Sequence, residues 1–74
     1  MSYRVIRERI IDEDIGTYVA YGIELRSKGK TVRKISDIFL SYRKIKHLCR
    51  LCNKLKPDNG QIDYIVQDCI EEYM

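Results

Sequence analysis

The three cysteines and the one histidine are the residues of this chain best suited to metal or redox chemistry. His47, Cys49 and Cys52 lie close together in the sequence, and Cys69 follows downstream. Thiolate and imidazole groups are the usual ligands of structural zinc. On a regular helix, however, Cys49 and Cys52 lie about 60° apart while His47 is roughly 140–160° from each, so the three side chains cannot point at one ion.

Packing in the core is the preferred interpretation of the three cysteines. Each falls on a predicted buried helix face, where cysteine behaves as a small hydrophobe. Metal or redox chemistry and a disulfide are the alternatives, although three is an odd number and a disulfide scaffold needs more. The sequence therefore predicts no metal and no cofactor, and reduced thiols place the chain in the cytoplasm.

Residues that serve in nucleophilic or acid–base catalysis are sparse. His47 has no acid three or four residues away to orient it. Ser41 and Lys44 have Ser-x-x-Lys spacing, which is common by chance and has no supporting partner in this sequence. The glycines form neither a P-loop nor a dinucleotide-binding pattern. We therefore expect a protein that is not an enzyme and has no small-molecule substrate.

Positive charge gathers in the middle of the chain. Residues 26–56 hold eleven bases and one acid, whereas residues 57–74 hold five acids and no base. Four of the bases recur on one side of a predicted helix and four more come from a predicted hairpin. Together they form the candidate interaction surface: Arg43, Lys46, Arg50, Lys54, Lys28, Lys30, Arg33 and Lys34. Such a surface suits phosphates or an acidic protein, and a solvated face without a binding role is the alternative.

The partner of this surface is a protein or a nucleic acid. No recognised nucleic-acid motif accompanies the bases, and the second helix offers acids where a recognition helix would face phosphates. The acidic face of the second helix complements the basic stripe of the first, so a second copy of the chain or an acidic protein can satisfy both. We predict a non-enzymatic protein-interaction module that self-associates through charged helix faces, with weak nucleic-acid binding as the alternative.

Two helices are predicted in the second half of the chain, over about 38–55 and 60–73. Pro57 and the residues up to Gly60 separate them. In the first helix the apolar residues share one broad arc: Ile38, Ile45, Leu48, Cys49, Leu51, Cys52 and Leu55, with Tyr42 at its margin. In the second helix they recur at the same period: Ile62, Ile65, Val66, Cys69, Ile70 and Tyr73.

The first half of the chain predicts an antiparallel meander with strands at about 3–11, 17–26 and 31–35. The second strand alternates most clearly, and its inward face holds Thr17, Val19, Tyr21, Ile23 and Leu25. Two polar turns with glycine, at 12–16 and 27–30, connect the strands. Val32 is expected to lie across from Leu25.

These elements predict an α+β fold, with a two- or three-stranded meander covered by two antiparallel helices in a single domain over 1–74. The inward face of the sheet is expected to pack on residues from both helices: Ile45, Leu48, Cys52, Ile62, Ile65, Val66 and Cys69. No stretch of roughly 18 apolar residues is present to span a bilayer, so no membrane partner is predicted.

Three short segments carry a resemblance to a known family: Tyr21-Gly22-Ile23, Leu51-Cys52-Asn53 and Asp63…Val66…Asp68. In the order strand pair, helix, proline turn, helix, they resemble a family of short uncharacterised proteins, a domain of unknown function, from clostridia-type bacteria. The resemblance implies a small build of two or three strands followed by two helices. It implies no activity and no catalytic residues.

Overall fold

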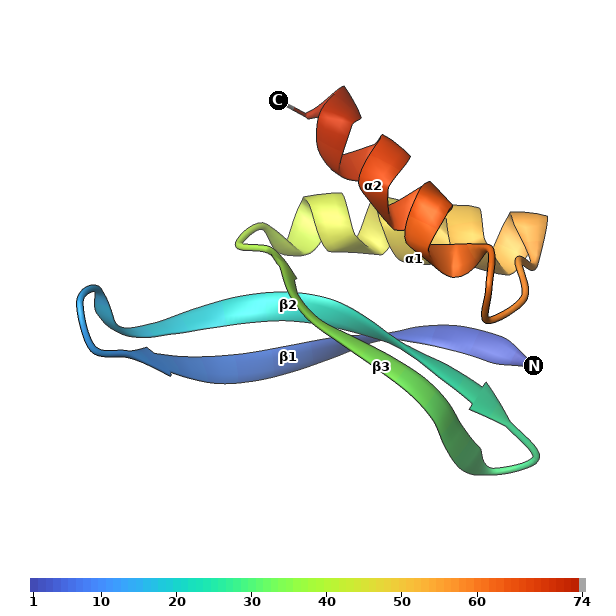
Figure 1. Cartoon of the computed structure of the whole chain (residues 1–74), viewed down its shortest axis with the longest axis horizontal. Coiled ribbons are helices and arrows are strands. Elements are labelled where there is room, and N and C mark those ends of the chain that lie inside the picture. Colours follow the sequence, from blue (N-terminus) through green and yellow to red (C-terminus); the bar gives the residue numbers. More distant parts are fainter. Residues whose placement is uncertain (74) are drawn as a thin grey trace.

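A three-stranded antiparallel sheet lies beneath two helices in the computed structural model, which describes residues 1–73 (Figure 1). Three strands come first, in the order in which they pair: β1 (Ser2–Asp12), β2 (Gly16–Ser27) and β3 (Lys30–Phe39). Helices α1 (Tyr42–Leu55) and α2 (Ile62–Glu72) follow. The predicted α+β class, a meander followed by two helices, is confirmed.

Strands β1 and β2 form a long hairpin. Their pairing runs from Ser2 opposite Arg26 to Asp12 opposite Gly16 without a register shift. At the turn, Asp12 Oδ1 accepts hydrogen bonds from two backbone N–H groups, and Gly16 has a φ of 97°, which glycine adopts without steric cost. Figure 1 shows that this turn extends well beyond the helices, so the far part of the hairpin is an arm with no helix above it.

Strand β3 is bent by an irregularity opposite Gly22. Residues 36–38 of β3 stand against this single residue of β2, and Asp37 among them has a φ of 53°. Such bulges bend a strand and increase its twist. As a result β3 crosses closely over Gly22, where a side chain would collide with the carbonyl group of Ile35.

The bulge explains where the predictions for this region differ from the structure. The third strand continues past the predicted 31–35 to Phe39, and the first helix begins at Tyr42 rather than near Ile38. Because the bulge interrupts the two-residue alternation, the end of the strand has the spacing of a helix. Val32 was expected across from Leu25, which is wrong, because a second register shift places Arg33 there. The other predicted boundaries differ from the structure by one or two residues.

The core lies between the sheet and the helices. Ile23 and Leu25 of β2 are 1% and 2% exposed, and Tyr3 of β1 is buried beside them. The helix residues predicted to meet the sheet are buried, except for a half-buried Ile65: Ile45, Leu48, Cys52, Ile62, Val66 and Cys69. Thr17 and Val19 are the errors in the predicted inward face, because they lie on the arm beyond the helices and are exposed, Val19 by 37%.

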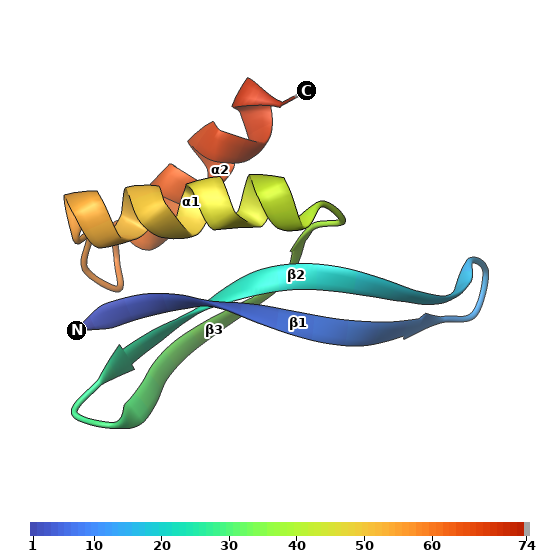
Figure 2. The ribbon, with the colours of Figure 1, turned by 180° about the vertical axis from the view of Figure 1, so that it is seen from behind.

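Helix α2 runs back across α1. Tyr73, which follows α2, lies against Lys44 and His47 near the start of α1, with the Lys44 Nζ 5.0 Å from the centre of its ring. Seen from behind, α1 is in front and lies over β1 and β2, while α2 lies on the side of β3 (Figure 2). Within residues 1–73, neither helix is long and apolar enough to cross a membrane.

Candidate interaction surface

The basic stripe of α1, defined here as Arg43, Lys46, Arg50 and Lys54, is exposed along its whole length. The four residues fall within an arc of about 80° and span roughly 16 Å of the helix. Among the residues that the structure describes, no carboxylate lies within ion-pair distance of any of them. The stripe is therefore a row of cations that no carboxylate of residues 1–73 neutralises directly.

Packing and capping fix the direction in which the stripe points. Ile45 and Leu48 on the opposite side of α1 are fully buried against the sheet, which sets the rotation of the helix. At its start, the Ser41 hydroxyl accepts a hydrogen bond from the Lys44 N–H group at 3.4 Å. At its end, Lys56 takes a left-handed conformation and its N–H group bonds to a carbonyl of the last turn.

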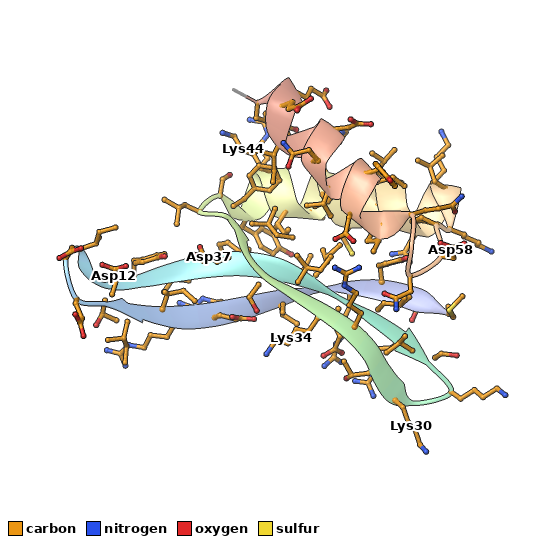
Figure 3. The ribbon with its side chains drawn as sticks, in the orientation of Figure 1. Asp12, Lys30, Lys34, Asp37, Lys44 and Asp58 are labelled. Atoms are coloured by element: carbon orange, nitrogen blue, oxygen red, sulfur yellow. The ribbon has the colours of Figure 1, made fainter. Side chains whose placement is uncertain are left out.

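The four bases of the predicted hairpin do not join this stripe. Arg33 points toward α2, where its guanidinium donates to both carboxylate oxygens of Asp63 at 2.7 and 2.9 Å, and these hydrogen bonds raise the pKa of Arg33. Lys34 lies on the face of the sheet away from the helices, 3.4 Å from Glu8 (Figure 3). Lys28 and Lys30 are exposed at the β2–β3 turn, at the end of the sheet. The structure therefore divides the eight predicted bases among four places.

Acidic residues line the exposed side of α2. Asp68, Glu71 and Glu72 are exposed and make no ion pair with any cation in residues 1–73. Asp63 differs, since it is occupied by Arg33. The two neighbouring helices thus present opposite charges to solvent, as the sequence predicts.

The three cysteines are free and buried, which confirms their predicted place in the core. Burial raises the pKa of each thiol, and it raises that of Cys52 to about 12, with a smaller contribution from Cys49 and Cys69. In the described part of the chain, no three His, Cys, Asp or Glu side chains are arranged to hold a metal ion. His47 is exposed, and its ring centre is 6.2 Å from that of Tyr73.

A junction between Tyr3 and Asn53 was not predicted from the sequence. The Asn53 side chain accepts a hydrogen bond from the Tyr3 N–H group at 2.8 Å and donates one to the Tyr3 carbonyl at 2.9 Å. Asn53 thereby takes the place of a neighbouring strand at the start of β1. The only signal in the sequence is a polar amide close to the apolar arc of the helix, which does not identify its partner.

The same hydrogen bonds show which way the backbone of β1 points. The Tyr3 N–H and C=O groups face away from β2. Because backbone direction alternates along a strand, the N–H and C=O groups of every second residue after Tyr3 also face away from β2; these residues are Val5, Arg7, Arg9 and Ile11. We call these four residues the β1 edge. Strand β1 is an edge strand of the sheet, and no backbone group of residues 1–73 pairs with the β1 edge.

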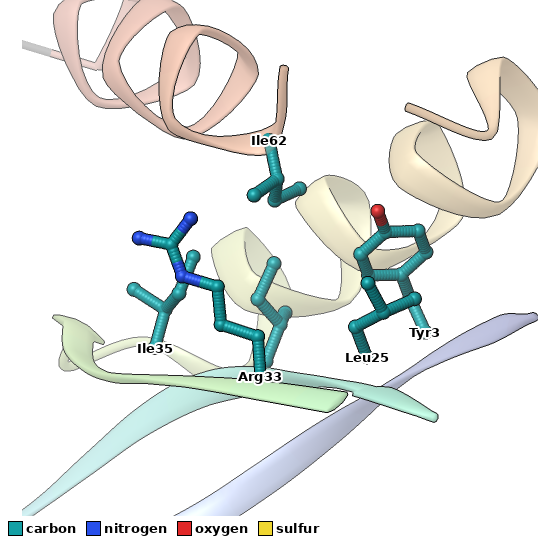
Figure 4. A pocket seen from close by; sticks show the side chains of 6 residues that line it. Tyr3, Leu25, Arg33, Ile35 and Ile62 are labelled. Carbon is teal, nitrogen blue, oxygen red and sulfur yellow. The ribbon is translucent and has the colours of Figure 1, made fainter. Parts of the chain in front are cut away.

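Hollows on the described part of the chain include one narrow hollow and one open groove. The first lies between the start of α2 and the sheet and is too narrow for a ligand; its lining is shown in Figure 4 and consists of Tyr3, Ile23, Leu25, Arg33, Ile35 and Ile62. The second is an open groove of about 310 Å³ bounded by Ile15, Tyr18, Asp37 and Leu40. In it the Tyr18 hydroxyl donates a hydrogen bond to Asp37 at 2.9 Å.

No protein-family model, curated protein or solved structure matches this chain. The resemblance to a family of short uncharacterised proteins therefore stays a prediction.

The described side chains offer charge rather than reactive groups. An ordinary thiol is mostly protonated at neutral pH, and the raised pKa values of the three buried thiols make the reactive thiolate rarer still. The basic stripe of α1 is exposed and is held in a fixed direction by the buried opposite face of the helix. An arrangement of this kind is suited to binding an anionic surface.

Proposed function

We propose that this protein is a non-enzymatic cytoplasmic interaction module that binds proteins through its charged helix faces, with a second copy of the chain as one partner. One observation carries the proposal: the basic stripe of α1 is exposed and has no carboxylate partner within residues 1–73. Like charges three or four residues apart on a helix repel by about 0.2–0.5 kcal/mol a pair. Carboxylates of a partner relieve this repulsion.

The state of the reactive groups supports a role without catalysis. A cysteine nucleophile works as a thiolate, and all three thiols have raised pKa values. His47 makes no hydrogen bond to a carboxylate in the described part of the chain. Free buried cysteines also suit a reducing compartment, which supports the cytoplasmic location.

Self-association follows from the two signs of charge. In a two-fold pair, the basic stripe of each copy can meet the acidic residues on α2 of the other, so each favourable contact is made twice. The contacts lie at the surface, where salt screens them over about 10 Å at 0.1 M ionic strength. Association should therefore weaken as salt is added.

Light scattering over a concentration series tests this proposal. We expect the mean mass to exceed that of a monomer at low salt and to fall as salt rises. The variant Arg43→Glu/Arg50→Glu should be monomeric. A matched control, Lys28→Glu/Lys30→Glu, changes the net charge equally at the β2–β3 turn and should associate like the wild type. A wild-type chain that is monomeric at every concentration and salt would rule out self-association.

Nucleic-acid binding is a second candidate, and the same exposed cations favour it. Four contacts with phosphates of duplex DNA would make the logarithm of the binding constant fall with a slope of about −3 to −4 against the logarithm of salt. The engagement of Arg33 by Asp63 and of Lys34 by Glu8 limits the surface that is free for phosphates. If neither DNA nor RNA is shifted in a gel at low salt, this candidate is excluded.

A further inference from the structure

The β1 edge is a regular strand edge without a partner in the described chain. The pairing of β1 with β2 continues over the whole strand without a shift, so its outward N–H and C=O groups are evenly presented. The edge at the other side of the sheet differs, because two register shifts interrupt β3. A straight, unpaired edge is a template on which another chain can add a strand.

The side chains of the β1 edge give it a positive charge. Arg7 and Arg9 share the face of β1 on which Tyr3 meets the helices. Both are exposed, and neither makes an ion pair within residues 1–73. Two acids of the sheet are paired with other bases, because Glu24 of β2 lies 3.0 Å from Arg4, and Glu8 of β1 lies 3.4 Å from Lys34.

The basic stripe of α1 lies on the same side of the molecule as the β1 edge. Asn53 points from α1 to the backbone of β1. On the helix, Lys46 and Arg50 lie about 20° and 60° from Asn53, so they lie on the side of α1 that faces the start of the β1 edge. Figure 2 shows α1 lying over β1 on this side. Cations therefore come from two elements that meet along one strand edge.

We propose that the β1 edge binds an extended segment of a partner protein as a fourth strand, and that this segment carries Asp or Glu at alternate positions. Its backbone would bond to the outward groups of Val5, Arg7, Arg9 and Ile11. Its acids would lie opposite Arg7 and Arg9, and the part of the segment beside the start of the β1 edge would lie below the cations of α1. This inference rests on the proposed function, because its partner is also a protein. It adds the site of binding, the β1 edge, and the type of segment that binds, an acidic strand.

Charge decides against a second β1 strand as the occupant. When two copies of β1 pair antiparallel, every register that uses three or four residues of the β1 edge places an arginine opposite an arginine. Like charges directly opposite in a sheet are destabilising. An acidic strand from a different segment has no such conflict.

Synthetic peptides provide the probe. One eight-residue peptide alternates Glu with Thr, since threonine favours strands, and a matched peptide has Lys in place of Glu. We expect the Glu peptide to bind, measured by fluorescence anisotropy, and the Lys peptide to bind at least tenfold more weakly. In Arg7→Glu/Arg9→Glu the preference should reverse, whereas Lys28→Glu/Lys30→Glu should bind like the wild type.

Backbone methylation separates strand addition from simple charge attraction. Two further Glu peptides carry N-methyl groups on one or the other alternate set of residues. We expect one methylated peptide to lose binding and the other to keep it, because an added strand bonds through only one of its two edges. Equal binding of both, or no binding of the Glu peptide, would overturn strand addition. Neither result bears on self-association, which light scattering measures without a peptide.

Amide hydrogen exchange places the peptide and checks the fold. In the free protein, the outward N–H groups of the β1 edge should exchange quickly and those of Ile6, Glu8 and Ile10, which face β2, slowly. Added Glu peptide should slow the exchange of Val5, Arg7, Arg9 and Ile11. Slow exchange that appears on another element instead would contradict the proposed site.

Discussion

Tyr3 joins three parts of the molecule through its backbone and its side chain. Its N–H and C=O groups bond to Asn53 of α1, and its hydroxyl donates a buried hydrogen bond to the carbonyl of Pro57 at 2.6 Å. Burial raises the pKa of the hydroxyl. The junction holds α1 in place above the start of β1, and so it also places the basic stripe beside the β1 edge.

Replacing Tyr3 by Phe should lower the free energy of unfolding by about 1–3 kcal/mol, because the Pro57 carbonyl loses its buried donor. Urea denaturation measures the change. Tyr64→Phe is the matched control, since Tyr64 is 75% exposed, and it should leave the stability nearly unchanged. Equal stability of the Tyr3 variant and the wild type would show that the hydrogen bond contributes nothing.

Because the thiol of Cys52 is buried, we expect the folded protein to lose stability at alkaline pH. Burial raises the pKa of Cys52 to about 12, above the ordinary value of 9.0 for a thiol, so the unfolded chain releases this proton first. The stability that the protonated thiol gives is complete below pH 9 and falls as the pH rises from 9 toward 12. The slope reaches about 1.4 kcal/mol per pH unit for one such group.

Unfolding free energies measured between pH 8 and pH 11 test this dependence. Cys52→Ala removes the group, so its stability should fall less steeply above pH 9 than that of the wild type. The variant also loses packing, but that loss is the same at every pH and does not affect the slope. Parallel curves for the two proteins would contradict the assignment to Cys52.

At the scale of the elements, Gly22 makes the bend of the sheet possible. A Cβ at this position would meet the Ile35 carbonyl and lie 3.1 Å from the Ser36 Cα, so the backbone of β3 would have to move. We expect Gly22→Ala to lower the stability by about 3 kcal/mol or more. Gly60→Ala is the control, because its Cβ would meet only a flexible Asp58 oxygen at 3.4 Å, and it should change the stability by less than about 1 kcal/mol.

The elements that could be predicted are those with an uninterrupted period. Strand β2 alternates over its length, and α2 repeats its apolar residues at helical spacing, so the sequence predicts both. The end of β3 could not be predicted, because Asp37 adopts a left-handed conformation that sequence patterns rarely encode for a residue other than glycine.

Only part of the candidate surface could be predicted from the sequence, namely the basic stripe of α1. A helical period determines which residues share a side of α1, so its stripe could be found from the sequence. The ion pair of Arg33 with Asp63 joins residues thirty positions apart, and the β1 edge depends on the order of strands in the sheet. Neither leaves a local pattern in the sequence.

For the molecule as a whole, shape and charge both favour association. The chain extends over 36 × 28 × 20 Å, and the arm of the hairpin exposes apolar side chains that no helix covers: Ile11, Ile15 and Val19. Leu40, between β3 and α1, is also exposed and borders the same groove as Ile15. A chain of this length buries only about 60% of its unfolded surface, so additional burial against a partner has a large relative effect. The thermal midpoint should therefore depend on association.

If the folded chain dimerises, the thermal midpoint should rise with protein concentration at low salt. A tenfold increase favours the dimer by about 1.4 kcal/mol, and half of this per chain shifts the midpoint of a small domain by roughly 3–5 °C. Calorimetry at several concentrations measures the shift. Arg43→Glu/Arg50→Glu should show no dependence, while Lys28→Glu/Lys30→Glu should behave like the wild type, because only the first pair lies on the basic stripe. A wild-type midpoint that is the same at every concentration would contradict self-association through the two helix faces.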